Sequence, residues 1–145
     1  MPECVFCRII AGDEAASLVY RDELCVAFMD IQPVNPGHLL IVPLTHAAQL
    51  AELDVASAER LMSVAQRLGL ALRQSSLRCE GVNLLLADGE AAGQDVFHVH
   101  LHAVPRFAGD GFGFRFSPGY HQRPPRADLD QAAALIRAAL PTAEA

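Results

Sequence analysis

The sequence predicts one globular domain that combines short β-strands with a single long α-helix. Its 145 residues suit one domain, and 52% hydrophobic with 19% charged residues is a composition that buries a core. Several short runs alternate apolar and polar residues with a period of two, which favours strands, whereas residues 54–75 follow the period of a helix. We therefore expect a mixed fold of strands and helices without a second domain.

The overall charge excludes some classes of protein. A net charge of -6 and a pI near 5.4 argue against a general nucleic-acid-binding or membrane-surface protein. No apolar run approaches the roughly 20 residues of a membrane span, and no basic stretch followed by an apolar one opens the chain. We expect a cytoplasmic protein that binds neither nucleic acid nor membrane, in which local groups hold any anionic ligand.

The four cysteines do not suit the disulfide framework of a small secreted protein. Cys4 and Cys7 are too close together, and Cys25 and Cys79 are isolated, so we assign no chemistry to the latter two. A C-x-x-C pair in a cytoplasmic chain is a redox pair or half of a metal site. This pair lies near the terminus with no strand before it, which favours the metal site.

Short elements follow in the first half of the chain. We expect a short helix and then three strands over residues 8–11, 17–21, 24–30 and 38–43. The loop 31–37 leads to His38 at the start of the third strand. A histidine at this position suggests that the end of the strand opens onto a functional site. His46 lies in the loop beyond this strand and has few obvious structural duties.

The long helix is expected over residues 54–75, with Asp54 or Ser57 as its N-cap. Its apolar face is predicted to be core, or core plus a subunit contact, and carries no chemistry. That face comprises Ala58, Leu61, Met62, Ala65, Leu68 and Leu72. In this interpretation Met62 fills a gap in the core.

Beyond the helix, a strand over 81–87 precedes a loop over 88–95 that contains two glycines. Glycines let consecutive backbone N–H groups form an anion-binding concavity, so we interpret this loop as part of a phosphate pocket. Residues 107–125, rich in glycine, proline and aromatics, predict an arm. A capping box of Asp128 and Gln131 predicts a short terminal helix.

The strand expected over residues 96–106 carries the chemistry. His98, His100 and His102 alternate with apolar neighbours, so the three imidazoles share one face of the strand. At about 3.3 Å rise per residue, adjacent histidines lie about 6.6 Å apart and the outer pair about 13 Å apart. Since a metal holds nitrogen ligands at about 2 Å, one ion can bind at most two neighbours of the row.

A tetrahedral zinc site would use Cys4, Cys7 and two histidines. The spacing above allows one end of the histidine row to take part, and we choose His98 together with His46. Four protein ligands leave no position for water, so we expect a structural rather than a catalytic zinc.

His100 then remains free as a neutral imidazole, which can act as a covalent nucleophile. Amides of the glycine loop, with His38 and His102, can stabilise the charge that develops on a phosphoryl group during transfer. The residues therefore predict attack on phosphorus through a phosphoimidazole intermediate.

The motif His98-Val-His-Leu-His102-Ala-Val resembles the signature of the histidine-triad family of nucleotide hydrolases and transferases. The similarity extends over nearly the whole chain. It includes Cys4-Val-Phe-Cys7, Ala27-Phe-Met-Asp-Ile31, Pro36-Gly-His38, Val42-Pro-Leu-Thr-His46 and Gly89-Glu-Ala-Ala-Gly-Gln94. Gly109-Asp-Gly-Phe112 further resembles the bacterial nucleotide-binding branch that carries the N-terminal cysteine pair.

The resemblance implies an α+β histidine-triad fold with a five-stranded antiparallel sheet, one long helix and a short C-terminal helix. It also implies a homodimer formed through the long helix and a strand edge. Residues 1–145 would form one such domain, with a zinc-binding segment at 1–12 and a C-terminal arm and helix at 107–145.

Site residues follow from the resemblance by position. It implies a pocket for a purine nucleoside monophosphate, a nucleotidyl-histidine intermediate and a zinc site on the four residues chosen above. The resemblance makes His100 the nucleophile and assigns the contacts with the phosphate to His102 and His38. It assigns the contact with the ribose hydroxyls to Asp30 and the contact with the base to Ile31. Gln94 and Asp95 belong to the phosphate loop.

Two positions depart from the family pattern. Ala87 stands where Asn or Gln is common, and Asp95 where Ser or Thr is common, which puts the substrate in doubt more than the nucleophile. We expect a hydrolase of nucleoside 5′-phosphoramidates or related nucleotide conjugates that needs no metal for its chemistry. Alternatives are a dinucleoside polyphosphate hydrolase, a nucleotide-binding or regulatory protein with negligible turnover, and a metallohydrolase.

Overall fold

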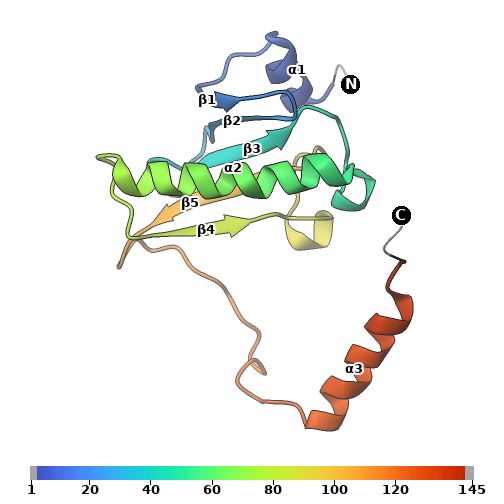
Figure 1. The fold of residues 1–145 in the computed structure, drawn as a ribbon. Helices are drawn as coiled ribbons and strands as arrows, with labels where there is room; N and C mark the ends of the chain where they lie inside the picture. The colour runs from blue at the N-terminus through green and yellow to red at the C-terminus, as the bar shows by residue number, and fades with distance from the viewer. Residues whose placement is uncertain (1–2, 143–145) are drawn as a thin grey trace. The chain divides into compact units, whose positions relative to one another are not determined.

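A five-stranded sheet in the order β1-β2-β3-β5-β4 forms the centre of the computed structural model, which describes residues 3–142 (Figure 1). Every neighbouring pair of strands is antiparallel. The strands are β1 (Leu18–Arg21), β2 (Cys25–Met29), β3 (Leu39–Pro43), β4 (Gly81–Leu85) and β5 (Leu101–Arg106). This sheet and its helices confirm the expected α+β fold.

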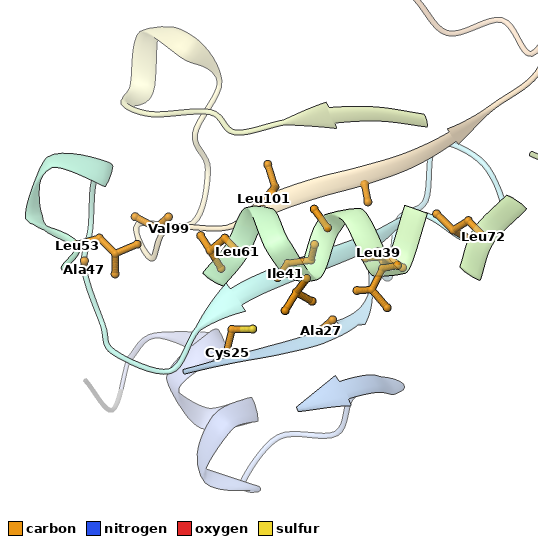
Figure 2. Close-up of a cluster of buried hydrophobic side chains, with 14 residues drawn as sticks. Cys25, Ala27, Leu39, Ile41, Ala47, Leu53, Leu61, Leu72, Val99 and Leu101 are labelled. Carbon is orange, nitrogen blue, oxygen red and sulfur yellow. The ribbon is translucent and has the colours of Figure 1, made fainter. Parts of the chain in front are cut away.

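The long helix α2 (Val55–Gln74) covers one face of the sheet. Asp54 is its N-cap, because the carboxylate accepts the Ser57 N–H at 2.9 Å. Figure 2 shows Leu61 of α2 packed with Ile41 and other buried side chains that point from the strands. The predicted helix is therefore confirmed, and its buried side chains pack against one face of the sheet.

Met62 does not fill the core, and that prediction is wrong. Its side chain is 56% exposed, whereas Val64, two residues later, is buried. Successive helical residues are about 100° apart, so Met62 lies to the side of a face that is centred on Leu61 and Leu68. Cys25 is buried in this core, and burial raises the pKa of its thiol to about 12, as suits a residue without chemistry.

The opposite face of the sheet packs against the helix α1 (Val5–Ala11). This helix begins three residues earlier than predicted, because Cys4 serves as its N-cap and accepts the Cys7 N–H at 3.5 Å. It ends as predicted at Gly12, whose φ of 86° suits a residue without a side chain. Phe6 is the residue of α1 that is buried in the second core cluster.

The largest difference from the predicted strands is at β5, which begins at Leu101 and not at residue 96. Its ladder with β3 starts at the pair Ile41–Leu101, and the Val99 N–H instead donates to the Ala47 carbonyl at 2.9 Å. Two short 3-10 turns, η1 (Leu50–Glu52) and η2 (Glu90–Ala92), complete this part of the chain. The other strands end within two residues of their predicted bounds.

The described residues divide into two compact units between Phe112 and Gly113. The second unit contains an aromatic stack of Phe116 on Tyr120, 3.9 Å apart, and the helix α3 (Arg126–Ala139), of which no residue is buried. Pro125 occupies the N-cap position of α3, so the predicted capping box is wrong: Asp128 lies inside the first turn.

Within residues 3–142, no helix has the length and apolar character of a membrane span.

Candidate functional site

Four side chains that are distant in sequence meet at the N-terminal helix. The ligand atoms of Cys4, Cys7, His46 and His98 all lie within 4.8 Å of one another. Sulfur and Nδ1 are 3.5 Å apart for Cys4 and His98, and 3.3 Å apart for Cys7 and His46. The Nδ1 atoms of His46 and His98 are 3.1 Å apart. The structure thus brings together all four residues that were predicted to hold zinc.

This arrangement fits a tetrahedral zinc ion. Zinc-to-ligand bonds of about 2.3 Å to sulfur and about 2.0 Å to nitrogen place neighbouring ligands roughly 3.3–3.8 Å apart, close to these distances. The Nε2–H of His98 donates to the Pro43 carbonyl at 2.8 Å, which leaves the Nδ1 lone pair of this ring free for a metal. Burial also lowers the pKa of His98, and so favours the neutral form that a metal requires.

His100 has a defined tautomer. Its Nδ1–H donates to the backbone carbonyl of His98 at 2.8 Å, so Nε2 carries the lone pair. The ring is buried, with 3% of the residue exposed, yet it lines a cavity. An imidazole that is fixed in this way presents one unprotonated nitrogen to a ligand, which is what a nucleophile requires.

A second chain of hydrogen bonds fixes His38 and His102. The Val34 N–H donates to Nδ1 of His38 at 3.0 Å, so the proton of this neutral ring is on Nε2. That Nε2 lies 3.0 Å from Nδ1 of His102 and 3.4 Å from the Asp30 carboxylate. His102 therefore accepts on Nδ1 and keeps its own proton on Nε2, where it can serve as a donor.

Electrostatics keep these two rings neutral. Burial, followed by the neighbouring imidazoles of His100 and His38, lowers the pKa of His102 from 6.5 to about 4. Burial likewise lowers the pKa of His38, although the charge of Asp30 opposes this shift. Neutral rings near neutral pH maintain the directional hydrogen bonds described above.

Asp30, His38 and His102 also bring three ligand atoms within 4.8 Å of one another. Their hydrogen bonds do not suit a metal. Because Nδ1 of His38 already accepts the Val34 N–H, a metal on Nε2 would have to displace its proton and leave an imidazolate. These contacts favour a proton-linked cluster over the centre of a metallohydrolase.

A cavity of about 270 Å³ opens beside His100 and His102. Its wall includes Phe28, Asp30 and Ile31 from the region of β2, and Asp95 from the glycine loop. The helix α1 adds an apolar wall that sequence reasoning missed. This wall is formed by Val5, Phe6 and Ile9. The cavity therefore joins an apolar region to a polar region formed by histidines and carboxylates.

Phe6 is a residue that sequence reasoning missed and that contacts two of the site histidines. Its ring centre lies 5.9 Å from that of His98 and 5.1 Å from that of His100, each in an edge-to-face arrangement. The position of an apolar residue between the two cysteines was the signal available in the sequence. Phe6 thus links the ring of His100, the candidate nucleophile, to the zinc-type cluster, which consists of Cys4, Cys7, His46 and His98.

The glycine loop is held by Gln94, which is buried. Its side-chain oxygen accepts the Gly89 N–H at 2.7 Å, and its amide donates to the carbonyls of Ala48 at 2.7 Å and Val96 at 3.1 Å. These contacts position the loop, whereas the neighbouring Asp95 lines the cavity. A direct contact of Gln94 with a nucleotide stays a prediction.

Asn35 positions the loop before β3, and sequence reasoning also missed it. Its backbone carbonyl accepts the His38 N–H at 3.0 Å, while its side-chain amide donates to Asp110 and to the Pro105 carbonyl, each at 2.9 Å. Asp110 is in turn paired with Arg106 at 2.6 Å. The end of β5 thus helps to hold the backbone that carries His38.

Comparison with known proteins identifies the family. The sequence profile of the HIT domain matches residues 11–109. The chain belongs to the HIT family. A HIT-like protein of Borreliella burgdorferi, itself uncharacterized, is 41% identical over 116 residues, which cover 79% of this chain and 84% of that protein.

Solved structures of HIT proteins share the fold. A HIT family protein from Bacillus anthracis superposes with a TM-score of 0.87 at 35% identity, covering 96% of this chain and 98% of the other. A zinc-bound histidine triad family protein from Mycobacterium smegmatis gives 0.75 at 38% identity, covering 96% and 99%. A histidine triad nucleotide-binding protein from Candida albicans gives 0.82 at 27% identity, covering 94% and 96%.

Proposed function

We propose that this HIT protein is a hydrolase that cleaves the α-phosphate linkage of nucleoside 5′-phosphoramidates or related nucleotide conjugates and releases a nucleoside monophosphate. The observation that carries the proposal is the hydrogen bond that Nδ1 of His100 donates to the carbonyl of His98, which leaves Nε2 of this ring for a ligand in the cavity that the ring lines. A fixed, neutral imidazole at the wall of a ligand-sized cavity suits nucleophilic attack on phosphorus.

The reaction proceeds in two displacements. In the first, the lone pair of Nε2 of His100 forms a bond to phosphorus while the bond from phosphorus to the leaving amine breaks. The electron pair stays on the amine nitrogen, which takes up a proton from water. In the second, water attacks the phosphorus of the nucleotidyl-histidine, the bond to Nε2 breaks, and the proton of the water passes to solvent.

The neighbouring residues divide the binding of the nucleotide. The Nε2–H of His102 donates to a phosphate oxygen, and His38 holds the ring of His102 in this tautomer. Asp30 accepts from the ribose hydroxyls, and Ile31 contacts a purine base together with the apolar wall of α1. Gln94 and Asp95 belong to the phosphate loop. The similarity to the histidine triad nucleotide-binding protein from Candida albicans supports a nucleotide as the ligand.

The zinc is proposed to be structural and to take no part in the chemistry. Cys4, Cys7, His46 and His98 would supply four ligands and leave no open position for water or substrate. When bound, the ion supplies only a crosslink between α1 and the segment that precedes β5. The zinc-bound relative from Mycobacterium smegmatis supports the choice of metal.

We also propose that the chain forms a homodimer through α2 and β4. β4 is an edge strand of the sheet, and edge strands present unpaired backbone groups. Met62, Leu70 and Leu84 are exposed there, and Leu84 shares one surface hollow with Met62 and another with Leu70. An exposed apolar patch at a sheet edge suits an interface with a second copy.

The decisive experiment replaces the nucleophile. We expect His100→Gly to lower the hydrolysis of adenosine 5′-phosphoramidate on the order of 10³-fold or more, because the covalent step is lost. Affinity for AMP should change by less than about threefold, since other residues hold the ligand. Steady-state kinetics and AMP titration measure the two effects. His121→Gly, a change outside the first unit, is the control that should keep full activity.

Mass spectrometry of the rapidly quenched wild-type protein should detect a covalent nucleotide on His100. Retention of most turnover by His100→Gly would refute the proposed mechanism. Tight binding of AMP by a wild-type protein that hydrolyses no conjugate would instead favour a nucleotide-binding or regulatory protein.

A further inference from the structure

The charges around the cavity are all of one sign. Asp30 and Asp95 line it, and no arginine does so in the described part of the chain. No lysine can serve this purpose, because all eleven basic side chains of the sequence are arginines. A ligand with several negative charges would therefore find carboxylates, but no neutralising side chain, at this site.

The two carboxylates differ in what they already bind. Asp30 accepts the Gln32 N–H at 2.8 Å and faces His38 at 3.4 Å. Asp95 instead lies beside His100, whose Nε2 is 3.9 Å from the carboxylate. The side chain of Asp95 is 85% exposed, whereas that of His100 is 3% exposed. Asp95 thus stands with an uncommitted charge at the mouth of the cavity, beside the nucleophilic nitrogen.

A group that leaves the phosphorus of a bound conjugate would pass near this position. Attack in line by Nε2 drives the leaving group away from the buried imidazole and toward the open side of the cavity. A second phosphate chain would bring further negative charges past the Asp95 carboxylate. An amine brings none, and an amine with a distant ammonium group brings a positive charge. In water, a unit charge on the leaving group about 6 Å from the Asp95 carboxylate changes the rate by about threefold, and by more where water is excluded.

We propose that Asp95 is a specificity-determining residue that selects nucleotide conjugates whose leaving group is a positively charged amine and rejects anionic leaving groups. This inference rests on the proposed function and names the substrate class within it. It ranks a nucleotide linked through nitrogen to a diamine or a basic amino acid above a dinucleoside polyphosphate. The departure from Ser or Thr at position 95 then changes selectivity and preserves the nucleophile.

Three matched substrates test the inference. AMP is linked through a P–N bond to 1,4-diaminobutane, to butylamine or to 4-aminobutyrate, so the bond that breaks is the same and only the distant charge changes. For the wild-type protein at low ionic strength we expect kcat/KM to fall from cation to neutral to anion, by about threefold or more at each step. Salt should compress this series, because Asp95 is exposed.

Asp95→Asn should bring the ratio of the cationic to the anionic substrate several-fold closer to one, by lowering the rate with the cation and raising the rate with the anion. Asp95→Ser should do the same, so the result does not depend on one variant. Glu90→Gln removes an equal charge from the same loop, outside the cavity lining, and should keep the wild-type ratio. Thermal melting verifies that each variant is folded.

The outcomes separate this inference from the function on which it rests. Similar rates for all three substrates, or a ratio that survives in both Asp95 variants, would overturn the inference while the hydrolase remains. A preference for diadenosine polyphosphate over all three conjugates would also overturn it. Failure of the wild-type protein to hydrolyse any of these compounds would overturn both.

Discussion

At the scale of single residues, backbone groups assign the protons of the site. The carbonyl of Pro43 fixes His98, the carbonyl of His98 fixes His100, and the N–H of Val34 fixes His38. The remaining nitrogen is an unprotonated Nδ1 in His98, an unprotonated Nε2 in His100 and a protonated Nε2 in His38. Three chemically identical side chains thereby acquire three capacities, which are to hold a metal, to attack and to orient a neighbour.

His102 offers a prediction about pH. Burial and the imidazoles of His100 and His38 lower its pKa from 6.5 to about 4, so between these values the unfolded chain binds more protons than the folded one. The stabilisation from the neutral ring is complete above 6.5 and is lost as the pH falls toward about 4. Urea unfolding should show a steeper loss of stability over this range for wild type than for His102→Gln.

The pKa of His102 can also be measured directly by NMR titration of its ring protons. We expect a midpoint near 4 for His102. A midpoint near 6.5, or equal pH dependence of unfolding in the two proteins, would contradict the described burial.

At the scale of elements, α1 has two roles. Its N-cap Cys4 and its residue Cys7 belong to the zinc-type cluster. Its residues Val5, Phe6 and Ile9 contribute to the cavity wall. Its seven residues are too few for a helix that is stable by itself, so its position depends on its tertiary contacts. The proposed zinc site and the ligand cavity are therefore linked through one short helix.

Removal of the metal ligand Cys7 tests this link. Cys7→Ser should abolish stoichiometric zinc binding, lower Tm by roughly 5–10 °C and weaken AMP binding severalfold, because the apolar wall is released. Metal analysis, thermal melting and AMP titration measure the three effects. Chelation of zinc from the wild-type protein should reproduce them.

Cys79→Ser is the matched control, since Cys79 lies outside the cluster and donates to the Gly81 carbonyl. It should keep its zinc, its Tm and its affinity for AMP. Unchanged melting in Cys7→Ser, together with zinc-free purified protein, would eliminate the structural site. Complete loss of hydrolysis on chelation in a protein that still binds AMP would instead favour a catalytic metal.

At the scale of the whole molecule, the sheet has two edges of different character. β1 and β4 are both edge strands, and each exposes a leucine, Leu18 at 57% and Leu84 at 39%. Leu84 adjoins the exposed apolar residues of α2. We expect Leu84→Lys to convert a dimer to a monomer, because the new charge would be buried between two copies.

Leu18→Lys places the same charge on the other edge and should leave the dimer intact. Sedimentation velocity over a range of protein concentrations measures both variants. A monomeric wild-type protein, or a dimer that persists in Leu84→Lys and dissociates in Leu18→Lys, would refute the proposed interface.

What the sequence predicts well in this molecule depends on short-range patterns. The periodicity of α2 and the sheet strands could be read from neighbouring residues, as could the alternation that directs Val99 and Leu101 into the core. The four zinc-type residues could be found because a metal limits which histidines can join a C-x-x-C pair.

The rest depends on contacts between distant parts of the chain. Asn35 meets Asp110 across 75 positions, and Phe6 reaches His100 only after α1 has packed on the sheet. The start of β5 was misplaced because alternation continues through His98 and His100, while the ladder with β3 begins later. Pattern alone does not report where a partner strand ends.

The reliance of the site histidines on main-chain partners has a consequence for protein engineering. The peptide carbonyl persists whatever residue is installed at position 43, and the N–H at position 34 persists for every residue except proline, provided that the backbone keeps its course. Libraries that diversify the apolar part of the cavity lining can therefore explore new substrates while the tautomers of the site histidines are kept. Insertions or deletions near these positions would break that chemistry even where every histidine is retained.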